Sequence, residues 1–227
     1  VAAGELGARL REIELARSLS ATGREPPGER QGRGHRGAGE ELCAWHVPYA
    51  AAGEFRPQLV FAADHDFASS DDLFGLYASR REALRSLRTL ADAHRLCPRQ
   101  LGLEEGPREG ACAAYRQKNC RGVCIGKETP ALHGARLLSA LAKFRLKIWP
   151  YRGPVVLVER DEFGMREDLH LIDRWRLVGT VGSEEELHAV LADGPSTGPF
   201  DPDVYRILSR FLQAGRLPLR QLSPCSG

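Results

Sequence analysis

The sequence predicts an α+β fold in which an N-terminal helix precedes a cysteine-rich domain and a small C-terminal α+β unit. Three observations lead to this prediction: apolar residues recur at helical spacing in several segments, short apolar runs typical of strands lie between them, and four cysteines fall within 28 residues. The chain has 227 residues, enough for one large or two small domains with cores of their own. Its hydrophobic content of 42% is ordinary for a globular protein.

The first unit is expected to be one helix over residues 4–19, because apolar side chains recur there at spacings of four and three. These side chains are Leu6, Leu10, Ile13 and Ala16. The following segment is rich in Gly, Pro, Arg and Glu and has almost no apolar side chain. We therefore divide the chain into an N-terminal unit at 1–20 and a linker at 21–40.

Residues 41–150 are expected to form a second unit with strands at 42–47 and 58–62. A short apolar segment at 74–79 ends at Ser79, which forms a capping box with Glu82 and opens a helix that runs to Cys97. The stretch 98–130 reads as loop, and a helix is expected at 131–144. Its apolar positions are Leu132, Ala135, Leu138, Leu141 and Ala142.

Residues 151–227 are expected to form a small C-terminal α+β unit. Strand patterns cover 155–159 and 169–181, with a loop at 161–164 that suits a hairpin. Ser183 and Glu186 form a second capping box, which predicts a helix at 184–192. Asp201-Pro202 places an N-cap and a first-turn proline before a helix that ends near residue 213.

Neither a membrane span nor a secretion signal is expected. No run approaches the roughly 20 apolar residues that a helix needs to cross a bilayer. The first six residues lack a basic region followed by an apolar stretch, so they do not resemble a signal peptide. They also lack an initiator Met, and we interpret the start as a cut inside a longer protein. A cytoplasmic protein with no membrane partner is therefore expected.

The net charge of +2 is unevenly distributed. Residues 80–152 hold 16 basic and 6 acidic side chains, whereas residues 1–79 and 153–227 each hold 8 basic and 12 acidic ones. Arg supplies 28 of the 32 basic residues, and its planar guanidinium suits phosphate oxygens. A basic middle third between two acidic segments suggests a polyanionic partner. An Arg-rich composition with solvated helix faces would produce the same count.

Four of the six cysteines are separated by 14, 7 and 3 residues. They are Cys97, Cys112, Cys120 and Cys124. Because nothing indicates secretion, a disulfide framework is not expected. A structural zinc site usually has two tight cysteine pairs and only one is present here, whereas an iron–sulfur cluster tolerates dispersed thiolates. The residues alone leave iron–sulfur, zinc and unliganded cysteines open.

The same region resembles UvrC-type excision-repair nucleases. Residues 74–79, Phe-Gly-Leu-Tyr-Ala-Ser, are similar to the F-G-P-Y-x-S segment of that family, which a helix and then a cysteine follow. The family continues with C-x7-C-x3-C, a small hydrophobic residue and Gly, as do residues 112–126. The resemblance implies that Cys97, Cys112, Cys120 and Cys124 are the ligands of a 4Fe–4S cluster. Cys43 and Cys225 are interpreted as a buried strand thiol and a tail thiol.

The N-terminal helix resembles the last helix of a GIY-YIG nuclease domain. In that domain a helix Glu binds the catalytic divalent metal, and by position this residue is Glu12. A carboxylate suits Mg²⁺, which prefers hard oxygen ligands. A Glu on an amphipathic helix is more often a solvated surface charge, so the metal role is implied by the resemblance alone.

The segment around Trp45 and the one from Pro150 to Val181 are closer to the shorter, Cho-type relatives of UvrC. In some bacteria such a module is fused behind an exonuclease domain of the DNA polymerase III epsilon type. The resemblance implies a bacterial, cytoplasmic hydrolase of the DNA-damage (SOS) response that incises damaged duplex DNA in nucleotide excision repair. UvrA-like or UvrB-like repair proteins are the implied partners.

Two groups of cations are candidate DNA contacts. Arg81, Arg85 and Arg88 recur along the outward face of the helix before Cys97, and Arg116, Lys118 and Arg121 lie among the cysteines. The contacts are expected to be with phosphate, and hence salt-dependent and independent of base sequence.

The chain departs from the family in its catalytic part. A GIY-YIG nuclease needs a hairpin with two tyrosines and a helix with an essential Arg, and no such hairpin precedes Glu12. One metal carboxylate cannot hydrolyse a phosphodiester by itself. We therefore expect residues 1–20 to be the end of a nuclease domain and this chain alone to be inactive.

Three alternatives remain at this stage: a cluster-stabilised module that only binds DNA or a repair partner, a polymerase-associated exonuclease fusion, and a zinc-stabilised interaction domain. Four histidines, at positions 94, 133, 170 and 188, are interpreted as surface or hydrogen-bonded side chains. Four acidic residues, at positions 161, 162, 168 and 173, are interpreted as hairpin and edge charges.

Overall fold

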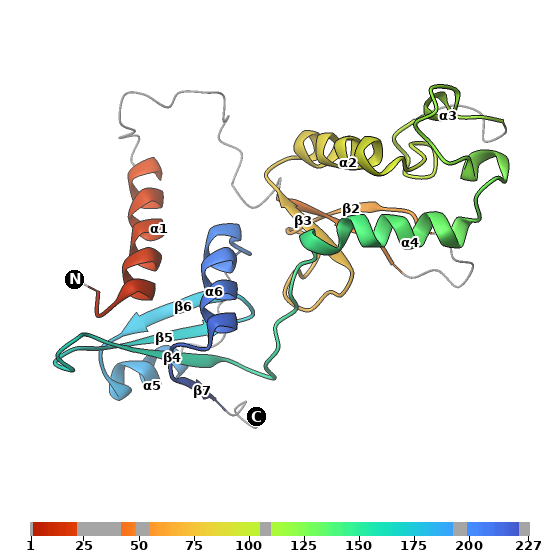
Figure 1. Ribbon diagram of the computed structural model, residues 1–227. Coiled ribbons are helices and arrows are strands. Elements are labelled where there is room, and N and C mark those ends of the chain that lie inside the picture. Colours follow the sequence, from red (N-terminus) through yellow and green to blue (C-terminus); the bar gives the residue numbers. More distant parts are fainter. Residues whose placement is uncertain (1, 22–41, 49–54, 105–109, 193–198, 223–227) are drawn as a thin grey trace. The chain divides into compact units, whose positions relative to one another are not determined.

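The computed structural model describes residues 2–21, 42–48, 55–104, 110–192 and 199–222 (Figure 1). The chain divides into two compact units, one made of residues 1–35 and 149–227 and the other of residues 36–148. Helices and antiparallel sheets occur in both, which confirms the α+β class. The predicted linker at 21–40 lies, from residue 22 onward, outside the described residues. Within the described residues no helix is long and apolar enough to span a membrane.

The unit of residues 36–148 is built on a three-stranded antiparallel sheet of order β2-β1-β3. Its strands are β1 (Cys43–His46), β2 (Gln58–Phe61) and β3 (Leu73–Tyr77). Helices α2 (Arg80–His94) and α4 (Pro130–Leu141) pack on it (Figure 1). The largely aliphatic core joins the sheet to both helices. It buries Trp45, Phe74, Leu87, Leu90, Leu137 and Leu141 among others.

Helix α2 begins where the capping box predicts. The backbone N–H of Glu82 donates to the Ser79 hydroxyl over 3.3 Å, and the Glu82 carboxylate accepts from the N–H of Ala78 over 2.9 Å. The helix ends at Arg95, whose left-handed backbone (φ 52°) turns the chain toward Cys97. The basic face of α2 is exposed, as predicted.

Helix α4 buries a face that only partly matches the apolar positions noted in the sequence: Leu141 is buried and Leu138 packs against the core, but the other noted positions are exposed. Leu132 is 61% exposed, whereas His133, Gly134 and Leu137 are buried. Gly134 allows this orientation, because a Cβ there would lie 2.0 Å from the Phe55 ring. The helix therefore presents Gly134 to the core, an orientation that the spacing of the apolar residues did not predict.

The other unit contains a four-stranded antiparallel sheet of order β6-β5-β4-β7. Its strands are β4 (Val155–Arg160), β5 (Glu167–Asp173), β6 (Arg176–Val181) and β7 (Leu219–Gln221). Helices α1 (Glu5–Ala21) and α6 (Pro202–Ala214) lie on one face and α5 (Glu184–Ala192) on the other (Figure 1). Residues 1–20 and 151–227 were expected to form separate units, but they belong to one compact unit in the structure.

Two features of this sheet were not predicted. Residues 169–181 form two strands, because Arg174 and Trp175 make a tight turn with positive φ of 49° and 63° and no glycine marks it. Strand β7 pairs with β4 from residues far along the chain, and its three residues have no strand-like alternation of their own.

Candidate functional site

The four predicted cysteines converge in the structure. Cys97 follows α2, Cys112 is the N-cap of a short helix, α3 (Ala113–Arg116), and Cys124 lies in the 3₁₀ turn η1 (Val123–Ile125). Together with Cys120, their Sγ atoms all lie within 4.8 Å of one another. Three of the four are buried and Cys124 is partly exposed. No other group of three or more His, Cys, Asp or Glu residues within the described ranges is placed to hold a metal ion.

Local backbone geometry directs these sulfurs inward. The N–H groups of Tyr115 and Gly122 donate to the Sγ atoms of Cys112 and Cys120, each over 3.3 Å, and the N–H of Cys112 lies 3.5 Å from Cys124 Sγ. Gly122 has φ of 94°, and a Cβ on it would lie 2.9 Å from the Tyr115 ring. The turn around Cys120 therefore requires glycine at this position.

Burial and hydrogen bonds shift the pKa values of three thiols, those of Cys97, Cys120 and Cys124. Removal from water raises the pKa of the Cys97 thiol above its ordinary range and that of Cys120 to about 11. At Cys124 burial acts in the same direction, but hydrogen bonds from the Cys112 N–H and the neighbouring thiols outweigh it and lower the pKa. The protein alone thus leaves at least two thiols protonated, and a bound cation would favour their thiolates.

Two contacts attach the cysteine loop to the helices. The backbone N–H of Cys97 donates to His133 Nε2 over 3.0 Å, and burial lowers the pKa of His133 to about 4, so the ring is neutral and able to accept. Arg136 forms a bidentate pair with Glu128, at 2.8 and 2.7 Å, and donates to the carbonyl of His94 over 2.7 Å. A buried ion pair thus links α4, the cysteine loop and the end of α2.

The four thiols are chemically suited to a single zinc ion or to an iron–sulfur cluster, and the two differ in the sulfur–sulfur separation that they require. The Cys97 and Cys112 sulfurs are 3.8 Å apart, which equals the edge of a tetrahedron with metal–sulfur bonds of about 2.3 Å, the length of a zinc–thiolate bond. A 4Fe–4S cluster is larger than one ion and would hold the sulfurs further apart. The chemistry of four thiolates with backbone N–H donors suits either group.

The predicted DNA contacts are exposed on α2 and on the cysteine loop. Arg81, Arg85 and Arg88 project from α2, and none forms an ion pair within the described part of the chain. The loop that contains Lys118 meets the end of α2, where the backbone carbonyl of Lys118 accepts a hydrogen bond from the Arg95 side chain over 2.6 Å. Asn119 also reaches Asp92 of α2 over 3.3 Å. The two cation groups, including exposed Arg116, Lys118 and Arg121, thus belong to neighbouring segments of one unit.

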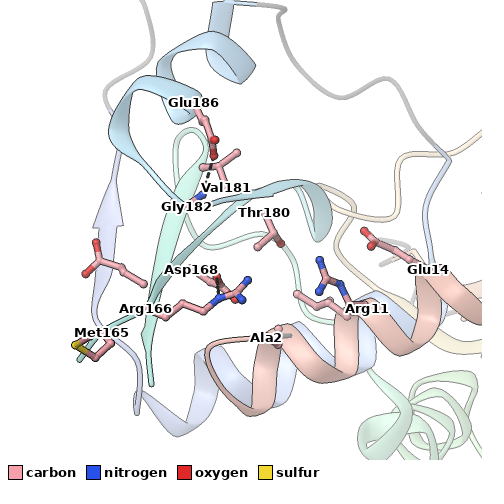
Figure 2. Close-up of a pocket in the computed structure, with 13 residues that line it drawn as sticks. Ala2, Arg11, Glu14, Met165, Arg166, Asp168, Thr180, Val181, Gly182 and Glu186 are labelled. Atoms are coloured by element: carbon pink, nitrogen blue, oxygen red, sulfur yellow. Dashed lines mark hydrogen bonds and ion pairs between the residues drawn. The ribbon is translucent and has the colours of Figure 1, made fainter. Parts of the chain in front are cut away.

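Glu12 lies in the other unit, on the exposed side of α1. The helix buries Leu6 and Leu10 against the sheet, whereas Ala16, expected on the same stripe, is exposed. Arg11 and Glu14, near Glu12 in the sequence, line a cavity of about 620 Å³ between α1 and the sheet (Figure 2). Glu12 does not line that cavity, and among the described residues no second predicted metal ligand lies beside Glu12.

A group of buried polar side chains lies under α1 and was not predicted from the sequence. Glu159, Asp168 and His170 are 4%, 4% and 0% exposed. They share one face of the sheet, because side chains alternate along each strand and Glu159 pairs with Asp168 across β4 and β5. Asp168, interpreted above as a hairpin charge, is instead buried. The sequence signal was the continuous apolar run at residues 155–158, because a strand that is apolar on both alternating sets is typical of a sheet covered on both faces.

Comparison with known proteins identifies the family. Excinuclease cho of Escherichia coli (strain K12) is 34% identical over 224 residues, which cover 99% of this chain and 70% of the relative. Excinuclease cho of Salmonella typhi is 36% identical over 220 residues, covering 97% and 69%. The chain belongs to the UvrC/Cho excinuclease family. The resemblance noted in the sequence is therefore confirmed.

Two family models match consecutive parts of the chain. Residues 45–143 match the UvrC/Cho excinuclease middle domain, which contains the four cysteines and the six candidate DNA contacts. Residues 154–226 match the Excinuclease Cho C-terminal domain, which contains the buried polar group under α1. No solved structure matches the chain. An excision nuclease acts on DNA, so a nucleic-acid substrate for the family agrees with the basic middle domain.

Proposed function

We propose that the chain is the DNA-binding and metal-stabilised part of an endonuclease that incises damaged duplex DNA in nucleotide excision repair. The observation that supports this most is the convergence of four thiols within the UvrC/Cho middle domain, which also contains both groups of exposed cations. A metal-held loop keeps its shape without a large core, so its cations can meet phosphates at little entropic cost. Because the DNA of a bacterial cell lies in the cytoplasm, the cytoplasm is the proposed location. UvrA-like or UvrB-like proteins are the proposed partners.

The proposed resident group is a 4Fe–4S cluster bound by Cys97, Cys112, Cys120 and Cys124. When bound, the cluster supplies structural cross-linking and a local charge that the protein can tune through hydrogen bonds to the sulfurs. The spacing of the sulfurs supports a single Zn²⁺ as the second candidate. The two candidates differ in iron, sulfide and zinc content, which can be measured directly.

Glu12 is proposed as the Mg²⁺ ligand of a GIY-YIG site for which α1 is the last helix. Its exposed position leaves the carboxylate open to a metal and to the rest of such a domain. Leu15 and Leu19 are 57% and 51% exposed on the same helix and offer apolar surface to that domain. Mg²⁺ would supply charge stabilisation at the scissile phosphate, while Glu12 would orient the ion.

Incision by the isolated chain is expected to be undetectable. Residues 1–227 contribute one metal carboxylate, and the remaining catalytic residues of a GIY-YIG domain are not in the sequence. The measurement is Mg²⁺-dependent nicking of a lesion-bearing duplex by the purified chain. Nicking that disappears in Glu12→Gln would show that the chain is a complete nuclease and would contradict this expectation.

DNA binding is expected to depend on Arg81, Arg85 and Arg88. Changing all three to Gln should reduce the slope of log affinity against log salt by about 2 to 3, because each phosphate contact contributes about 0.9. The measurement is fluorescence anisotropy of labelled duplexes of two unrelated sequences over a salt series. Arg206, Arg210 and Arg216, exposed in the other unit, supply a control triple variant with the same change of charge.

The control triple variant should keep the slope of the wild-type chain. Equal losses in both variants would show that net charge, and not the α2 face, governs binding. Absence of binding by the wild-type chain even at low salt would contradict the proposed role in DNA binding.

A further inference from the structure

The first turn of α1 is held by carboxylates from the sheet beneath it. Glu159 Oε1 and Oε2 accept from the backbone N–H groups of Leu6 and Gly7, each over 2.8 Å. Asp168 Oδ2 accepts from the N–H of Ala3 over 2.7 Å. The N–H groups at the start of a helix lack intrahelical partners and carry partial positive charge, so buried carboxylates bind them strongly.

Two glycines allow this close approach. A Cβ on Gly4 would lie 2.5 Å from the Glu159 carboxyl group, and one on Gly7 would lie 3.2 Å from both Glu159 Oε2 and His170 Cε1. Any larger residue at position 4 would have to displace Glu159 or the helix. The contact therefore depends on residues from two distant parts of the chain.

Side chains of the neighbouring strands β5 and β6 fix the direction of the Glu159 side chain. His170 Nε2 lies 3.3 Å from Glu159 Oε2, and its Nδ1 lies 3.0 Å from the Thr180 hydroxyl. Because a carboxylate only accepts, Nε2 carries the proton, and the neutral ring accepts from Thr180 through Nδ1. Burial lowers the pKa of His170, which keeps this neutral form. The second carboxylate, Asp168, forms an ion pair with Arg166 over 3.0 Å (Figure 2).

We propose that Glu159 is a positioning residue of the nuclease: it fixes α1 on the Cho C-terminal domain and thereby sets the place of the Glu12 carboxylate. This inference rests on the proposed metal role of Glu12. Glu12 follows Gly7 by five residues, about 7.5 Å along the axis at 1.5 Å per residue. The other end of α1 is held where Arg17 pairs with Asp201, the N-cap of α6. Contacts at both ends oppose sliding and rotation of the helix, so the C-terminal domain determines where a metal bound to Glu12 would sit.

The experiment uses Glu159→Gln, which keeps the shape of the side chain but removes its charge and one acceptor. Gly4→Ala is a second variant, which leaves the carboxylate intact and blocks its approach. Glu162→Gln, exposed in the β4–β5 turn, is the matched control. Amide hydrogen exchange on the 227-residue chain reports the contact itself. Exchange at Leu6 and Gly7 should rise roughly tenfold to hundredfold in both test variants, the loss expected for charge-assisted hydrogen bonds.

The second readout is Mg²⁺ dependence in a complete nuclease that contains this chain. A displaced ligand should raise the Mg²⁺ concentration for half-maximal incision about tenfold to hundredfold, the usual effect of losing an outer partner of a metal ligand. A purely structural role would lower the maximal rate through a smaller folded fraction and leave that concentration unchanged. Protection of the β4 and β5 amides verifies that the sheet remains folded.

Faster exchange together with a raised Mg²⁺ requirement supports the proposal, provided that Glu162→Gln changes neither. Unchanged exchange in both test variants overturns it, whatever the role of Glu12. Faster exchange with an unchanged Mg²⁺ requirement overturns the positioning role. A Glu12→Gln variant that keeps full activity would instead remove the proposed metal site, and the exchange result would still report the contact.

Discussion

Replacing Cys120 with Ala is expected to remove the bound metal group and to unfold the loop that surrounds it. The four thiols converge from segments with few other buried contacts, because the apolar cluster around them contains little beyond the cysteines themselves and Val123. Structural metal binding contributes on the order of 10 kcal/mol to the folding of such small sites. Loss of one of four ligands should therefore have the largest effect of any single substitution in the middle domain.

The measurement is visible absorption with iron, sulfide and zinc analysis on chain purified without oxygen. Broad absorption with about four irons and four sulfides per chain would support the cluster. One zinc and no colour would support the single-ion alternative, which the 3.8 Å sulfur separation favours. Cys43→Ala is the matched control, because Cys43 is equally buried but lies in β1, outside the metal site. A wild-type chain that binds neither metal would contradict both forms of the proposal.

Replacing Arg136 with Met is expected to destabilise the middle domain by about 3 to 5 kcal/mol, the usual cost of leaving one member of a buried ion pair alone. The Glu128 carboxylate is 8% exposed and loses both of its hydrogen bonds in this variant. The carbonyl of His94, three residues before Cys97, loses its donor as well. Urea unfolding followed by circular dichroism measures the change.

Arg206→Met is the control, since Arg206 and Asp203 form an ion pair that is 51% and 63% exposed and should be worth less than about 1 kcal/mol. Adding Glu128→Leu to Arg136→Met should recover part of the loss, because no charge then remains buried without a partner. Equal losses for Arg136→Met and Arg206→Met would show that the bidentate pair is not a structural link between the loop and the helices.

The sequence by itself determined where most helices begin. Ser79 with Glu82, Ser183 with Glu186, and Asp201 all form the side-chain caps that their spacing predicts, because a cap depends on residues three or four apart in the chain. The resemblance of the cysteine pattern to the UvrC family likewise predicted the one thiol cluster that the described residues contain. It did not determine which metal group the thiols bind.

Only the tertiary structure decided which surfaces meet. Strand alternation places Glu159, Asp168 and His170 on one face, but it does not reveal that α1, more than 140 residues away in sequence, covers that face. The buried side of α4 and the pairing of β7 with β4 were undetermined for the same reason. Local caps and motifs are fixed by short-range geometry, whereas the choice of partner across the chain depends on how whole faces fill space together.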